Sequence, residues 1–157
     1  MKIIICGAGE VGFSIAKYLA SENMEVTVID DNIDKLQKMT NAIDVRSIVG
    51  KTYNPNILEE ADVKEADWMI SVTENDETNI LVCEIAKILF NVKNTIARIK
   101  EKELLNKKWM DLFSNKGFKI DHIISPENEV ASMLARLVAV SGAHDLISFA
   151  NDKVRLI

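Results

Sequence analysis

A glycine-rich turn near the amino terminus is the feature with the clearest chemical use. The short apolar run Ile3–Cys6 leads directly into Gly7-Ala8-Gly9-Glu10-Val11-Gly12 and then into a segment of helical period. In a strand–turn–helix setting, the first glycine permits the tight turn, the second lets the backbone approach a pyrophosphate, and the third lets helix and strand pack closely. Phosphates would meet backbone N–H groups and the positive end of the helix dipole. The turn therefore predicts a dinucleotide site.

An acidic residue follows at the position where a ribose-binding carboxylate is expected. The next apolar run, Val26–Ile29, ends at Asp30, close to the ~20-residue separation at which a carboxylate accepts hydrogen bonds from the adenosine ribose. Asp31 comes next, and two carboxylates there would repel a 2′-phosphate, so NAD(H) is favoured over NADP(H). The competing interpretation is that both acids cap the helix starting near Ile33. We favour ribose contact for Asp30 and capping for Asp31.

Three further polar residues lie near the same predicted edge. Thr73 and Glu74 follow the apolar run Trp68–Val72, at the carboxyl end where open parallel sheets bind ligands. From spacing alone, ligand contact there is no better supported than simple capping of the next helix by Asn75 or Asp76. Arg98 interrupts an apolar run and requires a partner, which is either a phosphate or a neighbouring carboxylate.

The elements that must position these residues follow from the alternation of short apolar runs with longer helical segments. That alternation is typical of βαβ units in an α/β protein. The runs are nearly continuous, as expected where helices cover both faces of a parallel sheet. Asn54 and Ser125 each precede a proline and are predicted to cap helices. We expect a Rossmann-like, doubly wound, six-stranded parallel sheet from Ile3–Cys6, Val26–Ile29, Val45–Val49, Trp68–Val72, Ile96–Ile99 and Ile123–Ile124.

The carboxyl-terminal part departs from this pattern. A helix with a wide apolar stripe over Val130–Ser141 is expected to stop at Gly142, and Leu146–Phe149 and Val154–Ile157 predict two further strands. A lone hairpin is marginal in water. We therefore expect a first domain over residues 1–141, and in residues 142–157 the start of a second, small domain of a longer polypeptide.

Composition narrows the class of protein. The net charge of −5 argues against a phosphate backbone as partner, so no nucleic acid is expected. Cys6 and Cys83 lie in apolar runs and are predicted to be buried thiols, which fits a cytoplasmic protein. No catalytic acid, base or metal-ligand spacing stands out. The lysines at 100, 102, 107 and 108 are interpreted as a solvated helix face.

Several motifs together resemble one family. They are Ile3 to Gly12, Val72-Thr73-Glu74-Asn75-Asp76-Glu77-Thr78-Asn79, Ile96-Ala97-Arg98-Ile99, and Ile120-Asp121-His122-Ile123-Ile124-Ser125-Pro126-Glu127. Across essentially the whole chain the sequence resembles the RCK (KTN) family, and within it the N-terminal NAD-binding lobe of TrkA-type potassium-uptake regulators.

The resemblance implies a regulatory subunit, not an enzyme. Nucleotide binding would alter how an RCK assembly acts on a membrane-embedded Trk-type potassium transporter, at the inner face of the membrane. It implies nucleotide contacts from the backbone of Gly7, Ala8, Gly9, Glu10 and Val11, and from Asp30, Thr73, Glu74 and Arg98. It also implies a homodimer or higher oligomer formed through the Val130–Ser141 helix.

The resemblance also bears on the ligand. Related regulators that bind ATP or ADP often have arginine where this chain has Glu10, and an acid there would repel a triphosphate, so ATP and ADP rank behind NAD. The chain has Lys51 after Gly50, where the family often has an acidic or small polar residue. The contacts on the adenine side of the ligand therefore need not follow the family's pattern. The alternative function is the cofactor domain of an NAD-dependent dehydrogenase, for which the chain offers no catalytic domain.

Overall fold

The computed structural model describes residues 1–113, 117–139, 147–149 and 154–156 of the chain. The chain forms two compact units, Met1–Ile124 and Ser125–Ile157. The domain boundary that the sequence predicts after residue 141 stays a prediction.

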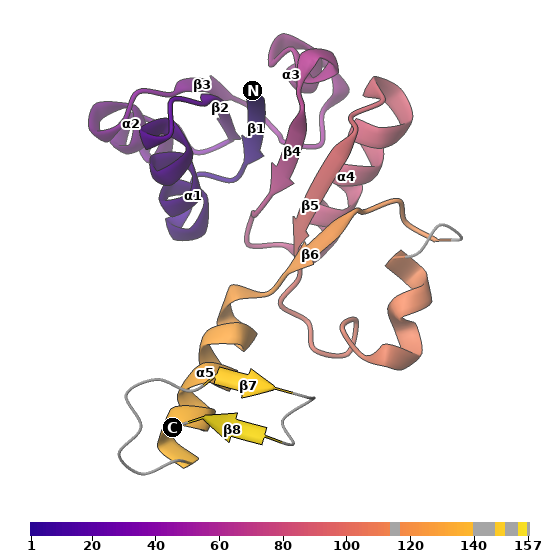
Figure 1. The fold of residues 1–157 in the computed structure, drawn as a ribbon. Helices are drawn as coiled ribbons and strands as arrows, with labels where there is room; N and C mark the ends of the chain where they lie inside the picture. The colour runs from indigo at the N-terminus through magenta and orange to yellow at the C-terminus, as the bar shows by residue number, and fades with distance from the viewer. Residues whose placement is uncertain (114–116, 140–146, 150–153, 157) are drawn as a thin grey trace. The chain divides into compact units, whose positions relative to one another are not determined.

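The first unit is built on one parallel sheet, in the strand order β3-β2-β1-β4-β5-β6 (Figure 1). All five strand pairings are parallel. The order reverses between β1 and β4, the switch point at which ligands of doubly wound sheets bind. The predicted fold is therefore confirmed, with strands β1 (Lys2–Cys6), β2 (Glu25–Asp30), β3 (Arg46–Val49), β4 (Trp68–Ser71), β5 (Asn94–Arg98) and β6 (His122–Ile124).

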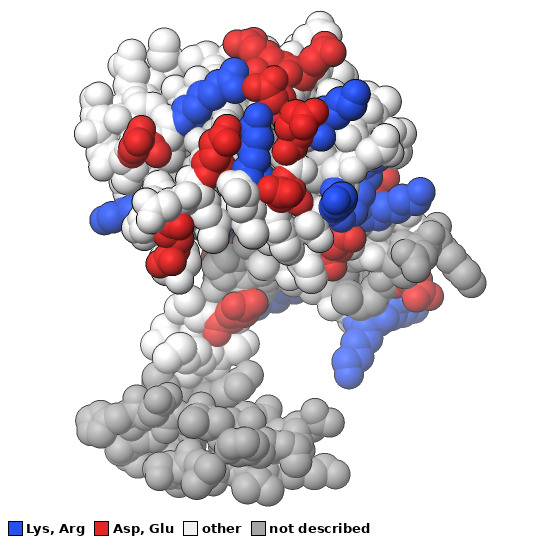
Figure 2. Space-filling view, turned by 45° about the horizontal axis from the view of Figure 1, so that its top comes forward, with Lys and Arg blue, Asp and Glu red and all other residues white. Residues whose placement is uncertain are grey.

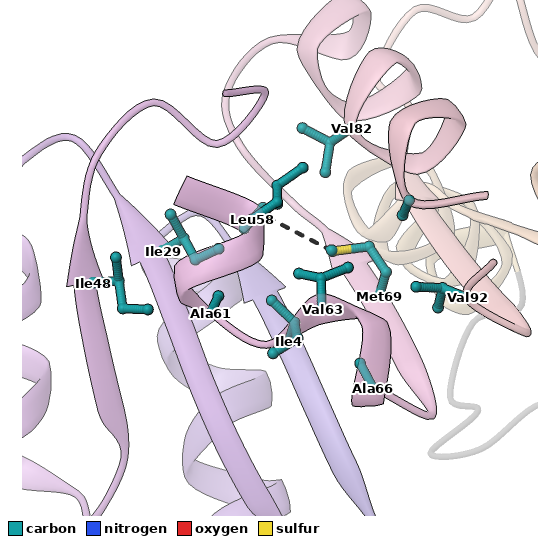
Figure 3. Packing of buried hydrophobic residues seen from close by; sticks show 12 residues of the cluster. Ile4, Ile29, Ile48, Leu58, Ala61, Val63, Ala66, Met69, Val82 and Val92 are labelled. Atoms are coloured by element: carbon teal, nitrogen blue, oxygen red, sulfur yellow. Dashed lines mark hydrogen bonds between the residues drawn. The ribbon is translucent and has the colours of Figure 1, made fainter. Parts of the chain in front are cut away.

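Helices cover both faces of the sheet because successive strand residues point to opposite sides. In β1, Ile3 and Ile5 pack into the cluster that also holds Ala16, Leu36 and Met39 from α1 (Glu10–Ser21) and α2 (Ile33–Ala42). On the other face, Ile4 and Cys6 pack under α3 (Pro55–Glu60), the short helix η1 (Val63–Glu65) and α4 (Asp76–Phe90). Figure 3 shows this second cluster, in which the Cys6 thiol lies 3.7 Å from the Met69 sulfur.

The predicted start of α3 is confirmed, since the Asn54 side chain accepts a hydrogen bond from the Asn56 N–H and Pro55 holds the first helical position. The edges of some strands differ from the prediction. Strand β5 begins at Asn94, two residues before the apolar run, because Thr95 is fully buried with its N–H donated to Asp121. A search for apolar runs does not find a polar residue that is buried with a hydrogen-bond partner.

The second unit begins with α5 (Pro126–Ala139), after Ser125, whose carbonyl accepts the first helical hydrogen bond from the Glu129 N–H. Strands β7 (Ile147–Phe149) and β8 (Val154–Leu156) pair antiparallel, close to the predicted hairpin. The predicted continuation of the helix to Ser141 and its stop at Gly142 lie outside the described residues. Among the helices that the structure describes, none has the length and apolar character of a membrane span.

Surface charges of both signs are interspersed on the face shown in Figure 2. Lys2 and Arg46 both pair with Asp62, at 3.6 Å and 2.9 Å. The Arg46 hydrogen bond and the nearby Lys2 hold the pKa of Asp62 below its ordinary value.

Candidate functional site

The glycine turn has the tight geometry that its sequence predicts. Gly7 has φ +111°, a left-handed conformation that L side chains rarely adopt, and a Cβ there would lie 2.9 Å from the Thr73 nitrogen. A Cβ on Gly12 would lie 1.9 Å from the Gly7 carbonyl oxygen. A Cβ on Gly9 would meet only the Glu74 carboxylate, at 3.7 Å. Gly7 and Gly12 are therefore required by the fold, whereas Gly9 leaves its side of the turn open.

Asp30 lies against this turn. Its Oδ2 accepts a hydrogen bond of 2.7 Å from the Ala8 N–H, and its Oδ1 accepts one of 2.8 Å from the Asn32 N–H. Two backbone donors thus fix the carboxylate at the carboxyl ends of β1 and β2. A carboxylate oxygen has a second lone pair, so both oxygens keep acceptor capacity toward a ligand hydroxyl.

The expectation that Asp31 caps the next helix is wrong. The N-cap of α2 is Asn32, whose side chain accepts a hydrogen bond from the Lys35 N–H. Asp31 instead pairs with Lys51, with 2.5 Å between Oδ2 and Nζ. This hydrogen bond lowers the pKa of Asp31 and raises that of Lys51 from their ordinary values, so both groups are charged at neutral pH.

The Asn79 side chain, from α4, holds the loop between β4 and α4 in place through hydrogen bonds. The Asn79 side-chain oxygen accepts hydrogen bonds from the Thr73 N–H, the Thr73 hydroxyl and the Ser71 hydroxyl at 2.8, 2.7 and 3.0 Å. Its amide nitrogen donates to the carbonyls of Thr73 and Arg98 at 3.1 and 2.9 Å. Asn79 is fully buried. One amide therefore joins the ends of β4 and β5 and sets the position of Thr73.

Arg98 has the carboxylate partner that was one of its two predicted alternatives. The Arg98 side chain is 7% exposed, and its guanidinium donates a hydrogen bond of 3.3 Å to a carboxylate oxygen of Glu74. The other Glu74 oxygen accepts from Lys100 at 3.3 Å. Hydrogen bonds from Lys100 and then Arg98 lower the pKa of Glu74 below its ordinary value. Lys100 lies two residues after the end of β5 and outside any helix, so its assignment to a solvated helix face is wrong.

A pocket of about 240 Å³ lies beside the glycine turn and Asp30, at the carboxyl ends of the central strands. Of the predicted site residues, the pocket is lined by Gly7, Gly9, Asp30, Thr73 and Glu74. Ala8, Val11 and Arg98 are not among its lining residues; the Ala8 N–H is already donated to Asp30, and Val11 packs on the core. Glu10 is exposed at the first position of α1, and no side chain caps that end of the helix.

Part of the pocket wall was not predicted from the sequence. Thr52 and Tyr53 line it from the segment after β3, next to Lys51, which the sequence had already indicated for the adenine side, and Lys35 lines it from α2. The rule that pointed to Thr73 and Glu74, ligand binding at the carboxyl ends of strands, applies equally to the residues after β3. Applied there, it would have found them. Thr78 and the α4 N-cap Asn75, whose side chain accepts from the Thr78 N–H, line the pocket as well.

Comparison with known proteins decides the family. The TrkA-N domain family model matches residues 3–126, which contain the parallel sheet except for Lys2 and all the residues that line the pocket. The chain belongs to the TrkA-N family.

Relatives of this TrkA-N chain include potassium uptake proteins. The Trk system potassium uptake protein TrkA of Vibrio alginolyticus is 41% identical over 157 residues, which is 100% of this chain and 34% of the relative. The protein of the same name from Azorhizobium caulinodans is 41% identical over 154 residues, which is 98% of this chain and 34% of the relative. The chain thus spans 34% of the length of these curated relatives.

Solved structures share the fold of the TrkA-N chain. The TrkA-N domain of the inner membrane protein ybaL from Escherichia coli has a TM-score of 0.73 at 19% identity, over 87% of this chain and 96% of that one. The GsuK channel bound to NAD has a TM-score of 0.72 at 18% identity, over 96% of this chain and 25% of that one. GsuK bound to ADP has a TM-score of 0.68 at 22% identity, over 87% and 33% of the two chains.

Proposed function

We propose that the pocket binds NAD(H), and that the chain is the nucleotide-binding part of a regulatory subunit of a Trk-type potassium uptake transporter. The observation that carries the proposal is the Asp30 carboxylate, fixed by the Ala8 N–H beside the glycine turn. An acid at this place can accept hydrogen bonds from the adenosine ribose while the turn and the start of α1 face the pyrophosphate. The names of the relatives and the NAD-bound GsuK channel support it.

The pocket also suits an adenine nucleotide without nicotinamide, as the ADP-bound form of GsuK illustrates. We rank ATP and ADP behind NAD(H) because Glu10 occupies the first helical position. A carboxylate there opposes the dense negative charge of a triphosphate more than the two charges of a dinucleotide pyrophosphate.

The regulatory role requires two conformations with different nucleotide affinity. NAD+ and NADH differ in charge and in ring planarity at the nicotinamide, so they can favour different arrangements of an assembly, and only differential affinity shifts that balance.

Helix α5 offers the assembly surface, because Val130, Met133 and Leu134 are 56%, 58% and 56% exposed. A second copy of this helix would cover them, and the assembly would act on the transporter from the cytoplasmic side.

Calorimetric titration of the purified protein with NAD+, NADH, ATP and ADP tests the ligand. We expect both dinucleotides to bind, and at least one of them more tightly than ATP. Tight ATP binding without dinucleotide binding would overturn the assignment. Sustained oxidation or reduction of nicotinamide with small hydroxy acids, followed by absorbance, would favour the dehydrogenase alternative instead.

Replacing Asp30 tests the ribose contact. Asp30→Ala should weaken NAD+ and NADH binding by about 1.5–3 kcal/mol, the contribution of a hydrogen bond to a charged group, or roughly 10- to 150-fold in Kd. Asp34→Ala is the matched control, because Asp34 is an exposed acid in the first turn of α2 and does not line the pocket. Circular dichroism checks that both variants fold. Equal dinucleotide affinity in the Asp30→Ala and wild-type proteins would remove Asp30 from the site.

A further inference from the structure

The wall of the pocket beyond Asp30 carries an ion pair that joins two loops. Asp31 follows β2, and Lys51 follows β3 by two residues. The pairing of these strands brings the loops together, with Asp30 opposite Val49 and the Gly50 N–H donated to the Asp30 carbonyl at 3.0 Å. The Lys51 ammonium then lies 2.5 Å from the Asp31 carboxylate, and both residues line the pocket.

The two neighbouring acids therefore do different things. Asp30 is fixed by two backbone N–H groups, whereas Asp31 contacts a side chain and is not needed to start α2, which Asn32 caps. The side chains of Lys51 and Asp31 are 60% and 51% exposed. The pair is accessible to a ligand, and an exposed pair of this kind contributes little to folding.

The chemistry of dinucleotide recognition gives this pair a use. In dinucleotide-binding folds the acid that ends strand two hydrogen-bonds the ribose 2′-OH, and a basic residue nearby accommodates a 2′-phosphate where one is present. A phosphate at that position needs a cation, and lysine binds phosphate as a compact point charge. Lys51 is such a cation, and its ammonium is already paired with the Asp31 carboxylate. A 2′-phosphate would have to displace the Asp31 carboxylate from Lys51 while it meets the negative charges of Asp30 and Asp31.

We propose that the Asp31–Lys51 pair determines the choice between NAD(H) and NADP(H): Asp31 holds Lys51, and this keeps a latent 2′-phosphate site closed. The inference rests on the proposed function, because it assumes a dinucleotide whose adenosine ribose lies at Asp30. It goes further by assigning the selectivity to one ion pair, in which the lysine favours the phosphorylated ribose and the aspartate opposes it.

The test is calorimetric titration of NAD+ and NADP+ into wild type, Asp31→Asn and the double variant Asp31→Asn with Lys51→Met, at low and high salt. The measured quantity is the ratio of the NADP+ and NAD+ dissociation constants. Wild type should prefer NAD+. Asp31→Asn should shift the ratio toward NADP+ by about tenfold or more, as expected for one newly available charge-assisted hydrogen bond, and salt should reduce the shift. The double variant should lose this shift toward NADP+.

A matched control separates Lys51 from general positive charge. Lys35 also lines the pocket, so Asp31→Asn with Lys35→Met removes the same charge from a different place. This variant should keep most of the shift. If wild type binds NADP+ as tightly as NAD+, if Asp31→Asn leaves the ratio unchanged, or if both lysine substitutions suppress the shift equally, this inference fails while NAD(H) binding stands. If wild type binds no dinucleotide, the proposed function fails and takes this inference with it.

Discussion

Gly12→Ala should destabilise the fold severely, by about 3 kcal/mol or more, the upper range for an overpacked site. An added Cβ would lie 1.9 Å from the Gly7 carbonyl oxygen, which is backbone and cannot rotate away. Gly7 is itself held by its N–H donated to the Ile29 carbonyl at 2.8 Å and by the proximity of Thr73. The clash therefore outweighs the advantage of about 1 kcal/mol that alanine has over glycine within a helix. Urea unfolding followed by circular dichroism measures the loss.

Gly9→Ala is the control for this prediction. A Cβ on Gly9 makes an ordinary contact of 3.7 Å, and Gly9 has φ −74°, which alanine adopts readily. We expect a loss below about 1 kcal/mol, the difference between glycine and alanine at an N-cap. If Gly9 serves ligand approach, its variant should fold and bind NAD(H) more weakly. A Gly12→Ala protein with the wild-type unfolding midpoint would show that the close packing of turn and helix is not required.

Asn79→Leu should have the second large effect, a loss of about 3–5 kcal/mol in the free energy of unfolding. Leucine matches the shape of asparagine but leaves the Thr73 N–H and the Thr73 and Arg98 carbonyls without the bonds that Asn79 makes. Each buried polar group left unsatisfied costs about 1–3 kcal/mol. Urea unfolding followed by tryptophan fluorescence reports the change, since Trp68 is partly buried in β4 and stacks on His122, whereas Trp109 is already exposed.

Two variants sharpen this prediction. Asn79→Asp keeps the oxygen that accepts from Thr73 but turns an acceptor toward the two carbonyls, so it should also destabilise the protein. Asn75→Ala removes an exposed hydrogen bond at the start of the same helix and should cost about 1 kcal/mol, as N-caps do. If Asn79→Leu is no more harmful than Asn75→Ala, the Asn79 network does not hold the two strand ends together.

Most of the fold could be predicted from the sequence, because its signals are local. The nearly continuous apolar runs mark strands buried on both faces. Gly7 has a backbone conformation that other residues rarely adopt, and a side chain on Gly12 would clash with the Gly7 carbonyl. Strand β5 was predicted less well. Thr95 is buried through a hydrogen bond to Asp121, a residue far along the chain, and no local pattern reveals that partner.

The doubly wound sheet, the glycine turn and the position of Asp30 could be read from the sequence, since each depends on residues adjacent in the chain or at a fixed spacing. Which charged side chains meet, in contrast, depends on how the strands pair in the folded chain. The pairing of β2 with β3 brings Lys51 to Asp31, and the loop after β4 meets the end of β5, so that Arg98 and Lys100 both reach Glu74. An ion pair depends on distance in space, and parallel strands bring together loops that lie far apart along the chain.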